Sequence, residues 1–99
     1  MRRRYLLAYD VRDQKRLSRC TRIANRFGWA VQYSVFVCDL SPGEVDMLLH
    51  ALGEVLAKRE DRLILLELGE AGSLRRRRQL FWLGERPAAL LDEKPPQVV

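Results

Sequence analysis

The chain has few of the residues that carry redox or nucleophilic chemistry. Its 99 residues include two cysteines, Cys20 and Cys38, and one histidine, His50. The cysteines lack C-x-x-C spacing, so they do not form a thioredoxin-like or zinc-ribbon motif. G-x-S-x-G, a glycine-rich phosphate loop and H-E-x-x-H are also absent. These gaps argue against the common hydrolase, nucleotide-binding and zinc-protease classes, and both cysteines are expected to be reduced core residues.

Long hydrophobic runs are absent as well. No window approaches the ~20 consecutive apolar residues of a membrane-spanning helix. Met1 is followed by three arginines, without the apolar run and small-residue cleavage site of a signal peptide. We therefore expect a cytoplasmic protein. With 47% hydrophobic residues the chain can form one domain with its own core.

Positive charge is abundant and unevenly distributed. The chain has 18 lysines and arginines against 13 acidic residues, a formal charge of +5. Residues 1–30 contain nine basic residues against Asp10 and Asp13, and residues 75–78 are four consecutive arginines. Surface charge also serves solubility, but this clustering favours a polyanionic partner.

Periodicity divides the chain into alternating strands and helices. The apolar run before Asp10 indicates a buried strand. Leu17, Cys20, Ala24 and Phe27 have helical spacing, with Asp13 as N-cap and Gly28 just past the end. The capping box at residues 41–44 starts a second helix. The expected strands span residues 3–10, 29–40, 62–68 and 73–83, and the expected helices span residues 13–27 and 42–59. At twelve residues the second strand is long, so a bend near 32–34 is expected to divide it.

This order predicts an α+β, ferredoxin-like βαββαβ sandwich with an additional C-terminal strand. Residues 1–83 would form the domain, and residues 84–99 a tail that is extended or docked on a partner. Both helices would cover one face of an antiparallel sheet. Since the strands are apolar on both faces, a second copy is expected to cover the other face, which gives a homodimer.

One face of the first helix is strongly basic. Its members fall within ~120° of arc, and no acid follows Asp13 to balance them. They are Arg12, Lys15, Arg16, Arg19, Arg22 and Arg26. A solvated helix face usually mixes charges of both signs, so we interpret this face as a binding surface for nucleic-acid phosphates. A plain solvated face remains the alternative.

Asp10 is the leading candidate for chemistry. A carboxylate at a strand end is either a structural or capping group or a metal ligand, and the residues leave both readings open. Mg²⁺ (or Mn²⁺) takes oxygen ligands, keeps several waters and needs only one or two carboxylates. Two copies of Asp10 meeting at a dimer axis would hold such an ion next to a phosphodiester. Asp13 is explained by its role as N-cap. His50 lies away from the apolar stripe of the second helix and is expected to face solvent.

Several motifs together resemble the CRISPR-associated protein 2 family. They are Y-D-V-R-D at 9–13, Lys15-Arg16, V-Q-Y-S-V-F at 31–36 and Glu60-Asp61 before the strand that ends at Leu68. They occur in the order found in that family, over about residues 4–83.

The resemblance implies a ferredoxin-like homodimer in which Asp10 binds Mg²⁺ at the dimer cleft. Tyr9, Ser34 and Phe36 match motif positions near that cleft, and Arg16 and Arg19 match basic helix positions. Family members are metal-dependent endonucleases acting on single-stranded RNA or double-stranded DNA. They also partner the CRISPR integrase in spacer acquisition, so a non-catalytic DNA-binding adaptor that bridges integrase dimers is the alternative function.

The chain departs from the family at two positions. Ala30 replaces a frequent arginine that would stabilise charge on the phosphate, and Val37 replaces a frequent glutamate. Both changes bear on nuclease strength more than on DNA binding. A ferredoxin-like RNA-binding module or toxin ribonuclease outside CRISPR systems is a further alternative. It would need aromatics exposed on central strands, whereas Tyr33 and Phe36 are expected to be buried.

Overall fold

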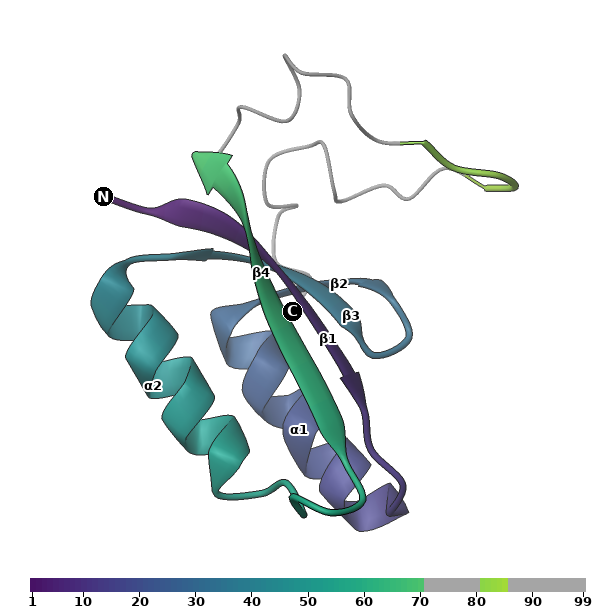
Figure 1. Ribbon diagram of the computed structural model, residues 1–99. Helices are drawn as coiled ribbons and strands as arrows, with labels where there is room; N and C mark the ends of the chain where they lie inside the picture. The colour runs from purple at the N-terminus through teal and green to yellow at the C-terminus, as the bar shows by residue number, and fades with distance from the viewer. Residues whose placement is uncertain (71–80, 86–99) are drawn as a thin grey trace.

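The computed structural model describes residues 1–70 and 81–85. Residues 1–70 form four strands and two helices. They are β1 (Arg3–Asp10), α1 (Gln14–Phe27), β2 (Gly28–Gln32), β3 (Val35–Leu40), α2 (Pro42–Gly53) and β4 (Arg62–Glu70) (Figure 1). This is the expected βαββαβ order.

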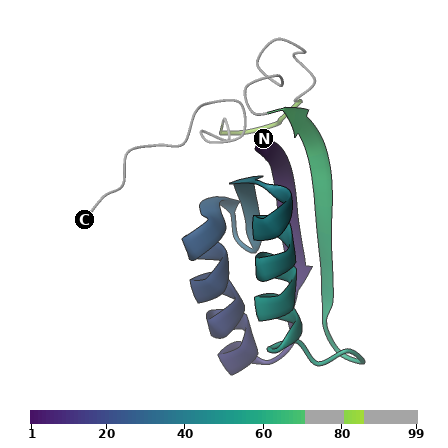
Figure 2. The same cartoon turned by 90° about the vertical axis from the view of Figure 1, so that its left-hand side faces the viewer.

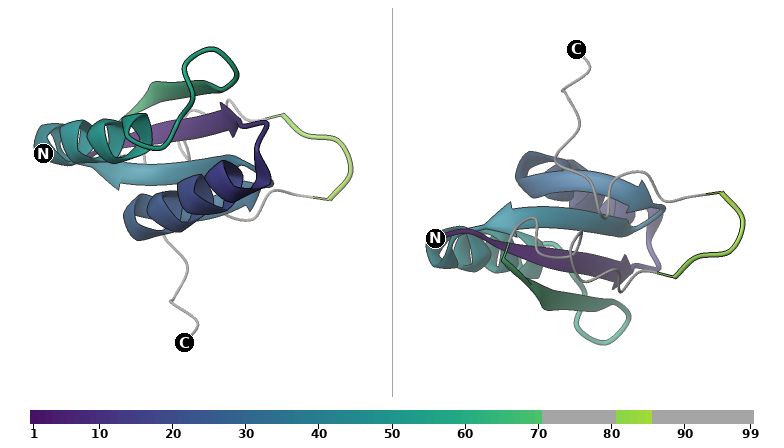
Figure 3. Two further views of the ribbon diagram at one scale, coloured as in Figure 1. Left: turned by 90° about the horizontal axis from the view of Figure 1, so that it is seen from below. Right: turned by 90° about the horizontal axis from the view of Figure 1, so that it is seen from above.

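The strands form one antiparallel sheet in the order β2-β3-β1-β4. In the centre of the sheet Leu7 pairs with Phe36 on β3 and Leu65 on β4. Figure 3 shows β1 and β3 side by side in opposite directions. Both helices lie on the same side of the sheet (Figure 2). The prediction of an α+β ferredoxin-like sandwich is confirmed.

The core lies between this side of the sheet and the helices. Its fully buried members include Leu7, Leu40, Leu48 and Leu52. Both cysteines are buried, free thiols at core positions, as expected. Burial raises the pKa of the Cys38 thiol to about 12, so this residue stays uncharged and packs as an apolar side chain.

Helix α1 begins as predicted but ends for a different reason. The Asp13 side chain accepts a hydrogen bond from the Arg16 backbone N–H at 3.0 Å, which caps the helix. Gly28 has φ −163°, so it is extended and not left-handed. Glycine is required there by close approach, because a Cβ would clash with the Val37 carbonyl oxygen and lie 2.6 Å from the Cys38 Sγ.

The long second strand is divided, as the sequence indicated. The turn at Tyr33 and Ser34 separates β2 from β3, and Ser34 is left-handed with φ 60°. Tyr33 is 80% exposed, so the expectation that it is buried was wrong. The turn removes Tyr33 from the strand alternation that placed it on an apolar face.

Helix α2 is shorter than predicted. It starts with the expected capping box, in which Ser41 and Glu44 bind each other's backbone, but it ends at Gly53 and not near residue 59. Glycine favours a helix end. Beyond it, the Glu60 and Asp61 N–H groups donate to the Ala57 carbonyl. This turn brings the Asp61 side chain to the Ala57 N–H, a contact that a continuous helix would not allow.

Strand β4 runs two residues further than expected. Its register shifts opposite Arg4 and Tyr5, and Gly69 adopts φ 113° there. Of the strand predicted over 73–83, residues 73–80 lie outside the described part, and residues 81–83 are not in a strand. The arginines at 75–78 and residues 86–99 of the predicted tail also lie outside it. No helix among the described residues is long and apolar enough to cross a bilayer.

Candidate metal and nucleic-acid site

Asp10 is the last residue of β1 and is exposed. It lies opposite Arg62, the first residue of β4, in the antiparallel pairing. Within residues 1–70 and 81–85 its carboxylate makes no hydrogen bond or ion pair. A rigid, paired strand therefore presents a free carboxylate to solvent.

The segment after Asp10 is fixed at each residue. Val11 is 8% exposed and packs in the core. The Arg12 backbone N–H donates to Asp61 Oδ1 at 3.1 Å, and Asp13 caps α1. The direction in which the chain leaves β1 is therefore determined by packing and hydrogen bonds, with little freedom left at Asp10.

Asp61 is the centre of this arrangement. Its side chain is fully buried, and it accepts hydrogen bonds from four donors. Two come from the Arg16 guanidinium, at 2.8 Å from Nε and 3.2 Å from Nη2. The others are the N–H groups of Arg12 and Ala57. The Arg16 hydrogen bonds, aided by the two backbone donors, hold the pKa of Asp61 far below its usual range, so it is ionised.

The basic face of α1 is divided by this contact. Arg16 is bound to Asp61 and lies 3.6 Å from Glu60, so its guanidinium is engaged within the chain. The other five members are exposed and make no ion pair with any described residue: Arg12, Lys15, Arg19, Arg22 and Arg26. These five cations are free to meet phosphates.

Two of the three residues expected near a cleft are core residues. Tyr9 is 7% and Phe36 2% exposed, and their rings stack with centroids 6.2 Å apart on the helix side of the sheet. The Tyr9 hydroxyl is 2.8 Å from Thr21 Oγ1 on α1. Their strand positions turn them toward the helices, so neither lines an open cleft here. Ser34 is partly exposed, and its carbonyl accepts a hydrogen bond from the Tyr9 N–H.

The sheet face away from the helices carries an outer apolar strip, formed by Leu6, Ala8, Ile64 and Leu66. Leu6 pairs with Leu66 and Ala8 with Ile64, and the next rung is Asp10 with Arg62. Ile64 is 59% and Leu66 53% exposed. The apolar strip thus leads directly to Asp10 on the same face.

The opposite end of the sheet holds a buried ion pair. Arg4 is 2% exposed, binds the Asp39 carboxylate through two nitrogens at 2.8 and 3.0 Å, and lies 5.2 Å from the Trp29 ring centroid. Arg4 therefore stabilises the fold and is not part of an exposed basic surface, although it is one of the nine basic residues within residues 1–30.

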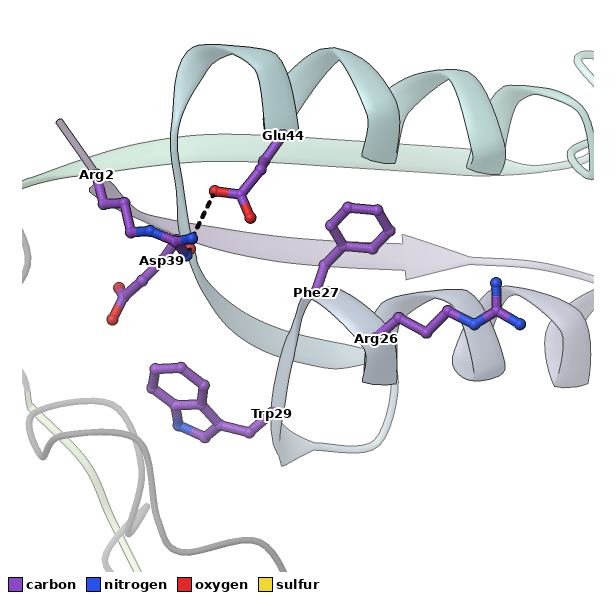
Figure 4. A pocket seen from close by; sticks show the side chains of 6 residues that line it. All are labelled: Arg2, Arg26, Phe27, Trp29, Asp39 and Glu44. Carbon is purple, nitrogen blue, oxygen red and sulfur yellow. Dashed lines mark hydrogen bonds and ion pairs between the residues drawn. The ribbon is translucent and has the colours of Figure 1, made fainter.

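A pocket of about 270 Å³ lies at this same end (Figure 4). It is lined by Arg2, Arg26, Phe27, Trp29, Asp39 and Glu44. Its Arg2 pairs with Glu44 at 3.3 Å and donates to the Asp39 carbonyl. The acidic groups in its wall make it a poor phosphate site, and it is remote from Asp10 because the two lie at opposite ends of β1.

The donor set around Asp10 fits a hydrated hard cation in part. No three His, Cys, Asp or Glu side chains of the described residues come together as a metal cluster. Mg²⁺ and Mn²⁺ accept one or two carboxylates with water completing the shell, and Asp10 is exposed and free of other partners. One chain thus offers one ligand.

Comparison with known proteins identifies the family of this chain. The family model of CRISPR associated protein Cas2 matches residues 1–76. The chain belongs to the Cas2 family. A curated relative, the CRISPR-associated endoribonuclease Cas2 of Geobacter sulfurreducens, is 32% identical over 71 residues, which cover 72% of this chain and 75% of the relative.

Solved structures share the architecture of this chain. Streptococcus pyogenes Cas2 superposes with a TM-score of 0.70 at 29% identity, covering 82% of this chain and 99% of that one. A hypothetical protein from Thermus thermophilus superposes with a TM-score of 0.73 at 26% identity, covering 86% and 94%. The resemblance inferred from the motifs is confirmed.

Sequence reasoning did not assign a role to Asp61. The pair Glu60-Asp61 belongs to the family pattern, but nothing in the sequence shows that Asp61 contacts Arg16, 45 residues away. The available signal was an acidic residue directly before an apolar strand, combined with a basic face that has no acid of its own. An unbalanced basic face indicates either an external anion or an internal one, and Asp61 is such an internal anion for Arg16.

Proposed function

We propose that this Cas2 family member is a metal-dependent endonuclease of CRISPR adaptation, centred on Asp10 and acting on single-stranded RNA or double-stranded DNA. The observation that carries the proposal is the exposed carboxylate of Asp10 at the end of a paired strand, close in sequence to five cations. Neither Asp10 nor these cations have an ion-pair partner in the part of the chain that the structure describes. Curated relatives are named endoribonucleases, which agrees with phosphodiester hydrolysis.

A homodimer would complete the site. The outer apolar strip is too exposed for a face that stays in water, and a two-fold axis beside it would place one Asp10 from each chain near the axis. Two carboxylates so placed would repel each other without a cation between them. A dimer therefore provides both the second ligand and the reason for a metal.

Each group of the chain then has a defined part. Asp10 from each chain would hold Mg²⁺ or Mn²⁺, and the cation would supply positive charge at the phosphate and increase the acidity of a nearby water. The five free cations of the basic face would bind flanking phosphates and keep the strand in place. Arg16 is the remaining member of that face, and its contact with Asp61 makes it the weakest candidate for phosphate binding.

The decisive experiment removes the Asp10 charge without changing its shape. Cleavage of single-stranded RNA and of double-stranded DNA is measured with Mg²⁺, with Mn²⁺ and with EDTA for the wild type, Asp10→Asn and Asp46→Asn. Asp46 is another exposed carboxylate, on α2, and serves as the matched control. We expect Asp10→Asn and EDTA to reduce cleavage by at least about 100-fold, and Asp46→Asn to cleave normally. Cleavage that survives both treatments would refute the proposal.

A second candidate function is the non-catalytic DNA-binding adaptor that joins CRISPR integrase dimers. Ala30 favours it, because this exposed position of β2 has no arginine to stabilise charge on a phosphate. The adaptor would bind duplex DNA and the integrase. Its Asp10→Asn variant would then support spacer integration as well as the wild type does. The same variant thus separates the two functions: loss of integration with Asp10→Asn argues against a purely structural adaptor.

A further inference from the structure

Asp61 is a buried carboxylate for which the proposed chemistry has no direct use. Its side chain is inaccessible, and both oxygens are occupied by the four donors described above. It therefore has no free lone pair directed at solvent with which to bind a metal or take a proton from water. Yet it contacts Arg12, in the segment after Asp10, and Arg16 on helix α1, which carries the basic face.

We propose that Asp61, together with Arg16, is a positioning residue that holds the Asp10 carboxylate in its metal-binding orientation. This inference rests on the proposed function of Asp10. Asp61 does not touch Asp10 and acts through the backbone between β1 and α1.

The position of Asp61 and its contacts allow it to orient the backbone around Asp10. It directly precedes Arg62, which is the strand partner of Asp10. It accepts the N–H of Arg12, two residues beyond Asp10, at 3.1 Å. It also binds the Arg16 side chain, while the Arg16 N–H is bound by Asp13. The chain from Asp10 to the first turn of α1 is thus tied to the start of β4.

Breaking these ties would leave Asp10 in place along the strand but release the backbone that follows it. A ligand carboxylate must be oriented before the cation arrives, or the cost of ordering it is taken from the metal affinity. Loss of the Asp61 contacts should therefore weaken metal binding even though no ligand has been removed. A role limited to folding would lower the melting temperature and leave the affinity of the folded protein unchanged.

The test measures Mn²⁺ binding directly, by titration calorimetry or by the electron paramagnetic resonance of free Mn²⁺, well below each melting temperature. It compares wild type with Asp61→Asn and Arg16→Lys, which keeps the positive charge but loses the two-nitrogen contact. We expect Asp61→Asn to weaken Mn²⁺ binding by about 10-fold, and Arg16→Lys to weaken it less. If Asp61→Asn fails to fold, Arg16→Lys alone decides the question.

Two controls separate the possible failures. Glu67→Gln removes a carboxylate from β4 whose partner, Arg3, is at the surface, and it should bind Mn²⁺ as the wild type does. Asp10→Asn should lose binding. If Asp10→Asn binds normally, the proposed function itself fails. If Asp10→Asn loses binding while Asp61→Asn and Arg16→Lys keep wild-type affinity, only the positioning role is refuted.

Discussion

Asp10, at the end of β1, and Asp61, directly before β4, lie at the same end of the sheet but in opposite environments. Asp10 ends β1, is exposed and has no partner among the described residues. Asp61 precedes β4, has a fully buried side chain and receives four hydrogen bonds. Asp61 directly precedes Arg62, and Arg62 is the strand partner of Asp10.

This contrast shows how a small domain divides its acids between stability and chemistry. A carboxylate whose oxygens are all taken contributes to the fold and cannot bind a ligand. A carboxylate left open by its surroundings contributes little to stability and is available to a cation. The basic face of α1 divides in the same way, because Arg16 is engaged by Asp61 while its neighbours remain free. Three measurements can break or sharpen this comparison.

The largest expected effect is on thermal stability. Asp61→Ala leaves the Arg16 guanidinium and the N–H groups of Arg12 and Ala57 without their acceptor, so we expect the melting temperature to fall by on the order of 10 °C. Asp10→Ala removes an exposed group without partners and should shift it by less than about 4 °C. Differential scanning calorimetry of both variants against wild type provides the measurement. Equal shifts would show that the two acids do not differ in this way.

The second effect is the dependence of stability on pH. The pKa of Asp61 is lowered in the folded state, mainly by the Arg16 hydrogen bonds. The unfolded chain therefore takes up the proton first as pH falls. The stabilisation by Asp61 is complete above its unfolded pKa of about 4 and is lost at lower pH. Melting temperatures from pH 7 to pH 2.5 should fall less steeply for Asp61→Asn than for wild type.

Glu44 titrates in the same range and must be separated from Asp61. The Ser41 backbone N–H lowers the pKa of Glu44, so this residue also stabilises the fold above its unfolded pKa, and that stabilisation is lost in acid. It is present in both proteins, so the difference between the two curves reports Asp61 alone. Parallel curves would mean that Asp61 is not ionised in the folded state at low pH.

The smallest effect concerns nucleic-acid binding. Arg19→Gln removes a free cation, so the slope of log affinity for duplex DNA against log salt should become shallower by about 0.9. Arg16→Gln should leave that slope unchanged and lower the melting temperature, because its guanidinium is already bound to Asp61. Fluorescence anisotropy over a series of salt concentrations measures both slopes. An equal reduction for Arg16→Gln would restore Arg16 to the phosphate-binding set.

Local patterns were sufficient for the elements of the fold. The apolar run before Asp10, the helical spacing from Leu17 to Phe27 and the capping box at Ser41 each correspond to an observed element. The boundaries failed where a distant contact decides them. Helix α2 stops at Gly53, and the turn beyond it brings Asp61 to Ala57. Gly28 is needed for its approach to β3 and not for a left-handed cap.

The candidate site was predictable in the same limited sense. Asp10 and the basic face stand out in the sequence as a strand-end acid and an unbalanced helix. Burial of Phe36 was expected from its apolar run, but engagement of Arg16 was not foreseen, because it depends on a side chain contributed by another element. Exposure of Tyr33 was missed because a two-residue turn without glycine or proline gives little local signal.

The sequence by itself determined the kind and order of the strands and helices over residues 1–70, since the periods of two and of 3.6 residues are local properties of the chain. It also determined that the charge is basic and concentrated on one helix. Only the tertiary structure decided which charges are engaged within the chain, because an arginine and an aspartate 45 residues apart become a partly buried pair only when β4 lies beside β1. Pairing of distant strands brings such groups together, and the number of candidate partners in the sequence is too large for pattern alone to select one.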